Sequence, residues 1–518
     1  MRKLAILSSV VFLAFAVGCG GSGGGSSTPV GVSTTVSISP AAGLSLTPGG
    51  NVSITATVST GASNTGVTWG LQGPGTLTNQ TSTSVTYVAP STASSDQDVV
   101  VTATAAANSS ATAYLPITVT APGTVLNSTS LVVDSGPAQN ATNLAFVSVR
   151  VCVPGTTTCG TVDHIQVDTG SEGLRILQSA LPASVSLPSL TDSSGNTINN
   201  CVSFLDTSYL WGPVQEADVK IAGEVGGAAL LQLISSSNSG IPTACTNGGT
   251  INENTPTLLG ANGILGVGPE PTDCIFAGSD FCDGSVSSTV PPIYFSCPSG
   301  GCGTSDSPVM ESGVNQVVNP VVLFNTDANG VAINFPPVAS TASTLAGTLT
   351  FGISTESNNT LGATATIFTM DGCGTFITVF DNQTLVNNTS CNGPGSFIDS
   401  GSNALYFPVP SGTTTLPTCP SSTSVGDLSS FYCPTTVQSL SATDQDPNFG
   451  TQATVNFSVD NAENLFTNNP TDSVFGTLGG TNTGGGFDWG LPFFFGRTVY
   501  TAIDGQVVST TTGPFWAF

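Results

Sequence analysis

The chain has 518 residues, of which only six are Lys or Arg while 31 are Asp or Glu, so its formal net charge is −25 at pH 7. So few cations cannot neutralise a phosphate backbone, which excludes nucleic acid as a partner. A single histidine, His164, and the absence of a paired C-x-x-C set also argue against zinc and against a histidine-dependent nucleophile, and we expect no metal and no cofactor.

Residues 1–18 have the pattern of an export signal. Two basic residues precede an apolar run, and the run ends in AVGC at Cys19. This ending resembles the lipobox of bacterial lipoproteins, in which the Cys is lipidated; the alternative is an ordinary signal peptide followed by an incidental Cys. Gly20 after the Cys goes with outer-membrane sorting in those lipoproteins. We expect an exported protein, anchored at the bacterial cell envelope by Cys19 alone, with residues 19–33 as a Gly/Ser-rich tether.

Residues 34–121 read as short strands separated by turns. Stretches such as NVSITATVS, DVVVTATA and YLPITVT alternate between apolar and small polar residues, as a half-buried strand does. Trp69 lies where such a fold often buries an aromatic side chain, and the segment has no Cys. The segment resembles the bacterial immunoglobulin-like domains, which implies a β-sandwich that acts as a spacer or adhesive unit.

The cysteines support export. Of the 13 Cys, Cys19 is assigned to the lipobox, which leaves an even number, and oxidising compartments favour disulfide bonds. Spacing suggests the pairs Cys152–Cys159, Cys201–Cys245, Cys274–Cys282, Cys297–Cys302, Cys373–Cys391 and Cys419–Cys433. Spacing alone does not fix this connectivity.

One motif occurs twice in the rest of the chain, as HIQVDTGS and as SFIDSGS. Each copy has an apolar strand end, an Asp, a hydroxyl residue, a Gly and a second hydroxyl residue: Asp168-Thr169-Gly170-Ser171 and Asp399-Ser400-Gly401-Ser402. Two carboxyl groups brought face to face cannot both ionise, so one keeps a proton. The ionised Asp can then draw a proton from water while the protonated one polarises a carbonyl. The pattern predicts Asp168 and Asp399 as catalytic residues for amide hydrolysis, with the flanking hydroxyls and glycines orienting them.

Around these motifs the chain resembles the pepsin-like aspartic peptidases. CVSFLDTSYLWGPVQEADVKIAGE is similar to their flap hairpin, NGILGVG to the element behind the first Asp, and FDWGLPFFFGRTVYTAIDGQ to their closing strands. Closer still, the body resembles a bacterial exported family of unknown function with the same blocks. The resemblance implies a bilobal β-barrel body, with an N-terminal lobe at 122–340 and a C-terminal lobe at 341–518. The expected fold class is therefore mainly β, an immunoglobulin-like sandwich followed by this body.

Some positions depart from the peptidase pattern. Phe204 stands where the flap usually has Tyr, although Tyr209 lies further along, and Arg175 replaces the Trp that usually follows the first Asp. Trp211 is expected in the core or the cleft wall. Glu172 adds an acid beside the first motif, and we expect it to point into water.

Two functions follow from these features. The first is an acid endopeptidase that cleaves polypeptide in a cleft between the two lobes. The alternative is a surface binding or adhesion lipoprotein that keeps the peptidase fold without its activity. Carboxyl groups within reach of one water favour the enzyme, whereas a cleft plugged by Arg175 or the flap favours binding.

Overall fold

The computed structural model describes residues 34–59, 65–204, 207–246, 251–276, 279–285, 292–387, 395–408, 416–482 and 485–518. The predicted signal peptide (1–18), the tether (19–33) and the lipidation site Cys19 lie outside these ranges. Strands dominate throughout, so the prediction of a mainly β chain is confirmed.

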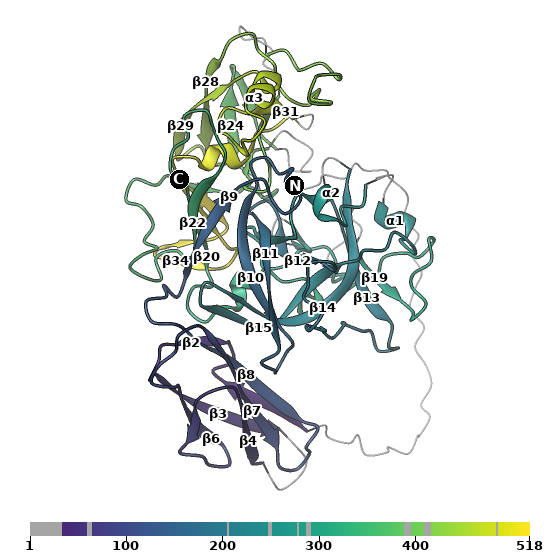
Figure 1. The fold of residues 1–518 in the computed structure, drawn as a ribbon, viewed down its shortest axis with the longest axis vertical. Coiled ribbons are helices and arrows are strands. Elements are labelled where there is room, and N and C mark those ends of the chain that lie inside the picture. The colour runs from purple at the N-terminus through teal and green to yellow at the C-terminus, as the bar shows by residue number, and fades with distance from the viewer. Residues whose placement is uncertain are drawn as a thin grey trace, which may run out of the picture.

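The first eight strands form two four-stranded sheets, at the bottom of Figure 1. One sheet has the order β1 (Thr35–Ser39), β3 (Asn51–Ser59), β6 (Ser84–Val88), β5 (Thr76–Thr78), and the other β2 (Leu44–Leu46), β8 (Thr112–Val119), β7 (Gln97–Ala105), β4 (Val67–Gln72). The alternation in NVSITATVS turns Ile54, Ala56 and Val58 inward. Ile54 packs in one core with Val99 and Leu115 of the other sheet, so the two sheets lie face to face.

The body begins with a closed barrel of six strands. β10 (Ala145–Cys152), β11 (Cys159–Asp168), β16 (Gly263–Val267), β12 (Glu172–Leu177), β15 (Glu224–Ile234) and β14 (Tyr209–Ile221) pair in this order. Pairing of β14 with β10 closes the ring. Leu174, Ile176 and Leu265 of this barrel belong to the main hydrophobic core. The barrel holds the first motif rigidly, because Asp168 is the last residue of β11.

The barrel is part of a sheet of 14 strands that continues into the second half of the chain. Beyond β14 come β13 (Thr197–Ser203) and β19 (Tyr294–Cys297); beyond β10 come β9 (Ser128–Val133), β22 (Leu345–Phe351), β20 (Gly330–Asn334), β33 (Thr498–Ala502), β36 (Phe515–Ala517) and β23 (Ile367–Thr369). The predicted boundary at 340/341 thus falls between β20 and β22, which pair with each other. The division into lobes stays a prediction.

The second half adds two smaller sheets, drawn mainly at the top of Figure 1. One contains β25 (Gln383–Leu385), β24 (Ile377–Phe380), β28 (Gln438–Gln445) and β29 (Gln452–Val459), and the other β26 (Phe397–Ile398), β32 (Asp488–Trp489), β27 (Leu405–Phe407) and β31 (Gly479–Thr481). Within the described ranges these strands close no second barrel, since those around the second motif span only two or three residues. The expected second barrel lobe is therefore not confirmed.

The remaining elements are short. Three two-stranded sheets join β17 (Ile275–Phe276) to β18 (Ser279–Asp280), β21 (Thr341–Ala342) to β30 (Val474–Phe475), and β34 (Val507–Val508) to β35 (Thr511–Thr512). The helices are α1 (Thr243–Thr246), α2 (Pro256–Leu259) and α3 (Ala462–Asn468), with 3-10 turns η1 (Gly313–Asn315), η2 (Pro320–Leu323) and η3 (Leu491–Phe494). None of the helices in the described ranges has the length and apolar character that crossing a bilayer requires.

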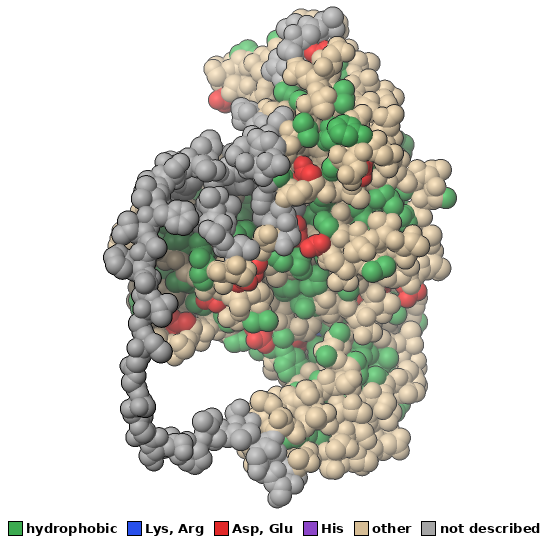
Figure 2. Space-filling model, turned by 180° about the vertical axis from the view of Figure 1, so that it is seen from behind, with side chains coloured by type: hydrophobic (Ala, Val, Ile, Leu, Met, Phe, Trp, Pro, Cys, Tyr) green, Lys and Arg blue, Asp and Glu red, His purple; other side chains and the backbone are tan. Residues whose placement is uncertain are grey.

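The prediction that the chain carries disulfide bonds is confirmed. Bonds join Cys152–Cys159, Cys201–Cys245, Cys274–Cys282, Cys297–Cys302 and Cys419–Cys433, which are pairs that the spacing suggested. Cys373 is also disulfide-bonded, and its predicted partner Cys391 lies outside the described residues. The face drawn in Figure 2 shows acidic side chains and, among the described residues, no Lys or Arg, in line with the composition.

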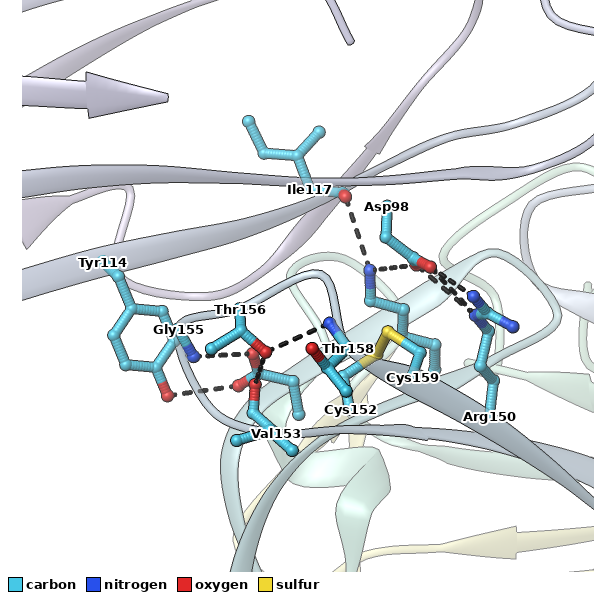
Figure 3. The surroundings of a disulfide bond; sticks show 12 residues. Asp98, Tyr114, Ile117, Arg150, Cys152, Val153, Gly155, Thr156, Thr158 and Cys159 are labelled. Carbon is cyan, nitrogen blue, oxygen red and sulfur yellow. Dashed lines mark hydrogen bonds and ion pairs between the residues drawn. A yellow bond between two sulfur atoms is a disulfide. The ribbon is translucent and has the colours of Figure 1, made fainter. Parts of the chain in front are cut away.

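A buried ion cluster fastens the first two sheets to the barrel (Figure 3). Asp98 of β7 accepts a hydrogen bond from Lys220 Nζ of β14 at 2.7 Å and from Arg150 Nε of β10 at 3.1 Å. The side chains of Lys220 and Asp98 are only 7% and 11% exposed. Burial tends to raise the pKa of Asp98, but the hydrogen bond from Arg150 and the charge of Lys220 hold it below its ordinary value.

Asp98→Asn is expected to lower the free energy of unfolding by about 3 kcal/mol at neutral pH, because it removes the ion-pair partner of the buried Lys220 ammonium. A carboxyl with a lowered folded pKa stabilises the fold above its unfolded pKa, about 3.9, and that contribution is lost as the pH falls through the lower folded value. The difference between wild type and variant should therefore shrink in acid.

Urea unfolding at neutral pH and at about pH 3 measures this difference. Arg150→Gln is the matched control, since the Arg150 side chain is 40% exposed and its loss should cost no more than about 1 kcal/mol. Equal losses in the two variants would mean that the buried Lys220–Asp98 pair does not stabilise the interface.

Candidate active site

Each predicted catalytic Asp ends an apolar strand and is held by the turn that follows it. The amide of Gly170 donates to Asp168 Oδ1 at 2.8 Å, and the hydroxyl of Ser171 lies 2.5 Å from Oδ2. The second motif repeats this arrangement. The amide of Gly401 donates to Asp399 Oδ1 at 2.7 Å, and Ser402 Oγ lies 2.8 Å from Oδ2. The Asp-hydroxyl-Gly-hydroxyl sequence thus folds into two equivalent loops.

The two loops are bonded to each other through their middle hydroxyl residues. Thr169 Oγ1 donates to the carbonyl of Ile398 at 3.1 Å and accepts from the amide of Ser400 at 2.9 Å. Ser400 Oγ donates to the carbonyl of Val167 at 2.8 Å and accepts from the amide of Thr169 at 3.1 Å. These four bonds are buried, so the loops are fixed relative to one another.

The glycine of each loop lies directly against the carboxyl of the other. A Cβ at Gly170 would lie 2.6 Å from Asp399 Cγ, and a Cβ at Gly401 would lie 2.4 Å from Asp168 Oδ1. A side chain at either position would push the two carboxyl groups apart. The glycines are required because the carboxyl groups approach so closely.

The two carboxyl groups share a hydrogen bond, and their pKa values move in opposite directions. Burial, the neighbouring Asp168 charge and the shared hydrogen bond raise the pKa of Asp399 to about 7. Burial also acts to raise the pKa of Asp168, but hydrogen bonds from Asp399, Ser171 and Gly170 hold it below its ordinary value. At mildly acidic pH the pair therefore carries one proton, on Asp399.

The strands around the two loops repeat the same pairing pattern. β16 runs parallel to β11 and antiparallel to β12, and β12 runs parallel to β15. Likewise β32 runs parallel to β26 and antiparallel to β27, and β27 runs parallel to β31. In this repeat Asp488 occupies the position of Ile264, because Ile264 pairs with Arg175 and Asp488 with Tyr406, the corresponding residue of β27.

Asp488 is a third acid at the site, which the sequence did not single out. Its side chain is only 5% exposed, and its Oδ2 lies 2.7 Å from Ser402 Oγ. Ser402 has one hydroxyl proton and contacts the carboxyls of both Asp399 and Asp488, so one of these two carboxyls must donate. Burial and the neighbouring Asp399 raise the pKa of Asp488 well above its ordinary value, which favours the protonated form of Asp488.

A cavity of about 550 Å³ opens beside this cluster. It is lined by residues of the first half, Leu144, Gln166, Asp168, Phe204, Glu253, Leu259 and Ile264, and by residues of the second half, Gly401, Ser402, Asn403, Tyr406, Ser430, Thr481, Asn482 and Asp488. The first half supplies mostly apolar side chains and the second half mostly polar ones. The cavity is large enough for several atoms of a substrate next to Asp168.

Of the residues predicted for the flap and cleft, Phe204 lines this cavity and the other three do not. Tyr209 and Trp211 pack with Phe295 and the disulfides of Cys201 and Cys297. Arg175 is buried and forms an ion pair with Asp273 at 2.9 Å. The Arg175 side chain is therefore directed to a separate network and does not plug the cavity.

Glu172 differs from expectation. It was expected to point into water, but it is 9% exposed, and its Oε1 accepts a hydrogen bond from the amide of Glu270 at 3.4 Å. The backbone of β12 passes against β16 here, which encloses the side chain. His164 lies in β11, with ring nitrogens 3.0 Å from Asp163 and 3.5 Å from Asp134.

Comparison with known proteins gives one extended match. Residues 123–518 match the family described as "Protein of unknown function (DUF3443)". No curated protein matches. Matching solved structures include the Bacteroides ovatus mixed-linkage glucan utilization locus protein SGBP-B, in complex with a mixed-linkage heptasaccharide, and a DUF4784 family protein from Bacteroides caccae.

The similarity to these two structures is weak. SGBP-B is 14% identical over 24% of this chain and 41% of its own, with a TM-score of 0.11. The DUF4784 protein is 12% identical over 36% of this chain and 51% of its own, with a TM-score of 0.12. The chain thus spans about half or less of either protein's length, and the likeness carries no argument about function.

These findings correct the family assignments made from the motifs. The family that residues 123–518 match is one of unknown function and not the pepsin-like peptidases, so the assignment to the pepsin-like peptidases is wrong. The immunoglobulin-like assignment of residues 34–121 likewise has no support beyond the two packed sheets. The physical reason is that two short turns specify the local geometry of two carboxyl groups, whereas a family is defined by the whole chain. By the match over most of its length, the chain belongs to the DUF3443 family of proteins of unknown function.

Proposed function

We propose that the body hydrolyses peptide bonds with a water molecule activated by Asp168 and Asp399. The observation that carries the proposal is the pair of hydrogen-bonded carboxyl groups, one with a lowered and one with a raised pKa, beside an open cavity. Two carboxyl groups whose pKa values are shifted in opposite directions can serve as the general acid and the general base of one reaction.

In the proposed reaction Asp168 is the base and Asp399 the acid. Water between the carboxyl groups gives a proton to Asp168 as its oxygen bonds to the substrate carbonyl carbon, and Asp399 gives its proton to the carbonyl oxygen. The tetrahedral intermediate then loses its C–N bond as the nitrogen takes the proton held by Asp168. The carboxyl product returns a proton to Asp399, so the pair ends with the single proton that it had at the start.

The surrounding loops support this assignment. The amide of Gly170 and the hydroxyl of Ser171 donate hydrogen bonds to Asp168, and these bonds favour its ionised form. The four bonds between Thr169 and Ser400 and the opposite strands fix the distance between the two acids. Such fixed geometry lowers the cost of orienting water and substrate.

The test is cleavage of a denatured protein by the purified body at about pH 4 to 6, where the pair should carry one proton. New peptide termini are quantified by mass spectrometry, with the Asp399→Asn variant, purified in the same way, as control. Cleavage by the wild type alone supports the proposal. No cleavage, or equal cleavage by the variant, refutes it.

The binding alternative is based on the altered flap and on the adhesive-looking domain at 34–121, and a cleft plugged by Arg175 or the flap would favour it. Arg175 is paired with Asp273 and does not line the cavity, which argues against a plug formed by Arg175. SGBP-B is described in complex with a glucan heptasaccharide, but its TM-score of 0.11 gives no basis for transferring that binding. Hydrolysis is therefore the function that we propose.

We also propose that Cys19 anchors the protein to the bacterial envelope, from the AVGC sequence and the Gly/Ser-rich stretch after it. In a bacterial host, labelled palmitate should be incorporated into the wild type and not into Cys19→Ala. The variant should appear in the soluble fraction. Incorporation at the wild-type level in Cys19→Ala would refute lipidation at this residue.

A further inference from the structure

The mechanism leaves one group of the site unused. Asp488 Oδ2 is bonded to Ser402, but Asp488 Oδ1 has no hydrogen-bond partner among the described residues. This oxygen is buried, and its residue lines the cavity. A buried acceptor without a partner is costly, so a donor brought into the cavity by a ligand would relieve that cost.

The charge of the cavity indicates which donor fits best. Three acids line it, Asp168, Glu253 and Asp488, and no described lining residue is Lys, Arg or His. Asp399 is hydrogen-bonded to Asp168. Clefts lined by one sign of charge concentrate ligands of the other sign. A cationic donor is therefore favoured over a neutral one.

The shape of the cavity suits a long basic side chain. Leu144, Phe204, Leu259 and Ile264 form an apolar wall, and the acids lie on the rest of the lining. Lys and Arg cover apolar surfaces with their methylene stems while their charged ends reach polar groups. One side chain can thus contact both parts of the cavity.

We propose that Asp488 forms the acidic end of a binding pocket for a basic side chain of the polypeptide, close to the bond that is cleaved. The proposal rests on the proposed function, because it places the polypeptide in the same cavity as the two catalytic acids. Binding of the ammonium group displaces the Asp488 proton to solvent. The Ser402 hydroxyl then donates to the ionised Asp488 at Oδ2, and the ammonium group donates to Oδ1. In the repeated strand pattern the corresponding residue is the apolar Ile264, so the preference arises on the Asp399 side only.

The experiment compares two peptide sets that differ only in Lys against norleucine, with the change scanned through each position beside the cleaved bond. The ratio of kcat/KM for the two peptides is measured on the wild type and on Asp488→Asn. Asn keeps the size of the side chain and can donate to Ser402, but it cannot carry charge. The wild type should favour Lys roughly tenfold or more at one position, and Asp488→Asn should bring that ratio to about one.

Glu253→Gln is the matched control, since Glu253 also lines the cavity. It should leave most of the Lys preference in place. A ratio that is unchanged in Asp488→Asn, or lost only in Glu253→Gln, overturns the proposal. Because both peptides meet the same variant, a general loss of activity cancels in the ratio.

Failure of the proposed function would look different, because then neither peptide would be cleaved by any variant. In that case calorimetry with the same two peptides decides the inference. Tighter binding of the Lys peptide to the wild type, but not to Asp488→Asn, upholds the pocket without catalysis. Equal binding of both peptides to the wild type rejects the pocket.

Discussion

Asp399→Asn and Asp168→Asn are each expected to reduce peptide cleavage by about 10⁴-fold, the upper range for loss of an acid or base. Asn cannot carry the shared proton, and it cannot accept one from water. Since the two residues act as a unit, the double variant should be no worse than either single one. The measurement is kcat/KM on one peptide under the same conditions.

Asp444→Asn is the matched control for these variants. Asp444 is fully buried, burial raises its pKa to about 7, and it does not line the cavity. Asp444→Asn should therefore keep most of the cleavage, even though it changes a similar carboxyl. A loss as large as that of Asp399→Asn would show that general disruption of the body, and not the pair of acids, explains the result.

Cleavage should depend on pH as a bell whose upper limb lies near pH 7. The active pair carries one proton, so the rate falls as the pH rises through the pKa of Asp399, about 7. It falls again in acid as Asp168 takes up a proton, below the ordinary Asp value of about 3.9. The pH profile of kcat/KM from about pH 2 to about pH 9 measures both limbs.

The raised pKa of Asp399 also predicts how the free energy of unfolding depends on pH. A carboxyl with a raised folded pKa contributes stability that is present below its unfolded pKa and lost as the pH rises through the folded one. Asp399→Asn, which cannot ionise, should then be at least as stable as the wild type above about pH 7. An upper limb at the ordinary Asp value, or a variant that unfolds more readily at this pH, would contradict the assignment of the raised pKa to Asp399.

The sequence carried enough information to find the two acids and their loops. An apolar strand end followed by Asp, a hydroxyl, Gly and a second hydroxyl is a local pattern, and each residue acts within its own loop or on the opposite one. The strand-rich class was also predictable, because alternating patterns such as NVSITATVS bury every second residue.

Asp488 could not be found in this way. Its role depends on the register of β32 against β27, which places it beside Ser402 across many residues of sequence. One signal was present in the sequence. The stretch DWG at 488–490 corresponds to ILG at 264–266, with the same final Gly and with Asp488 in place of Ile264. The expectation that Arg175 lies at the cleft failed for the same reason, since its ion-pair partner Asp273 comes from a distant segment of the sequence.

The most direct measurement of the central claim is a titration of the aspartate carboxyl groups by carbon-13 NMR in the wild type, Asp168→Asn and Asp399→Asn. The account predicts a carboxyl with a strongly raised pKa in the wild type that disappears in Asp399→Asn. In Asp168→Asn the pKa of Asp399 should fall, because the neighbouring charge and the shared hydrogen bond are gone. The wild-type signal that disappears in Asp168→Asn belongs to Asp168, and the one that disappears in Asp399→Asn belongs to Asp399. If both signals titrate near the ordinary value of about 3.9 in the wild type, the two acids share no proton and the proposed mechanism is wrong.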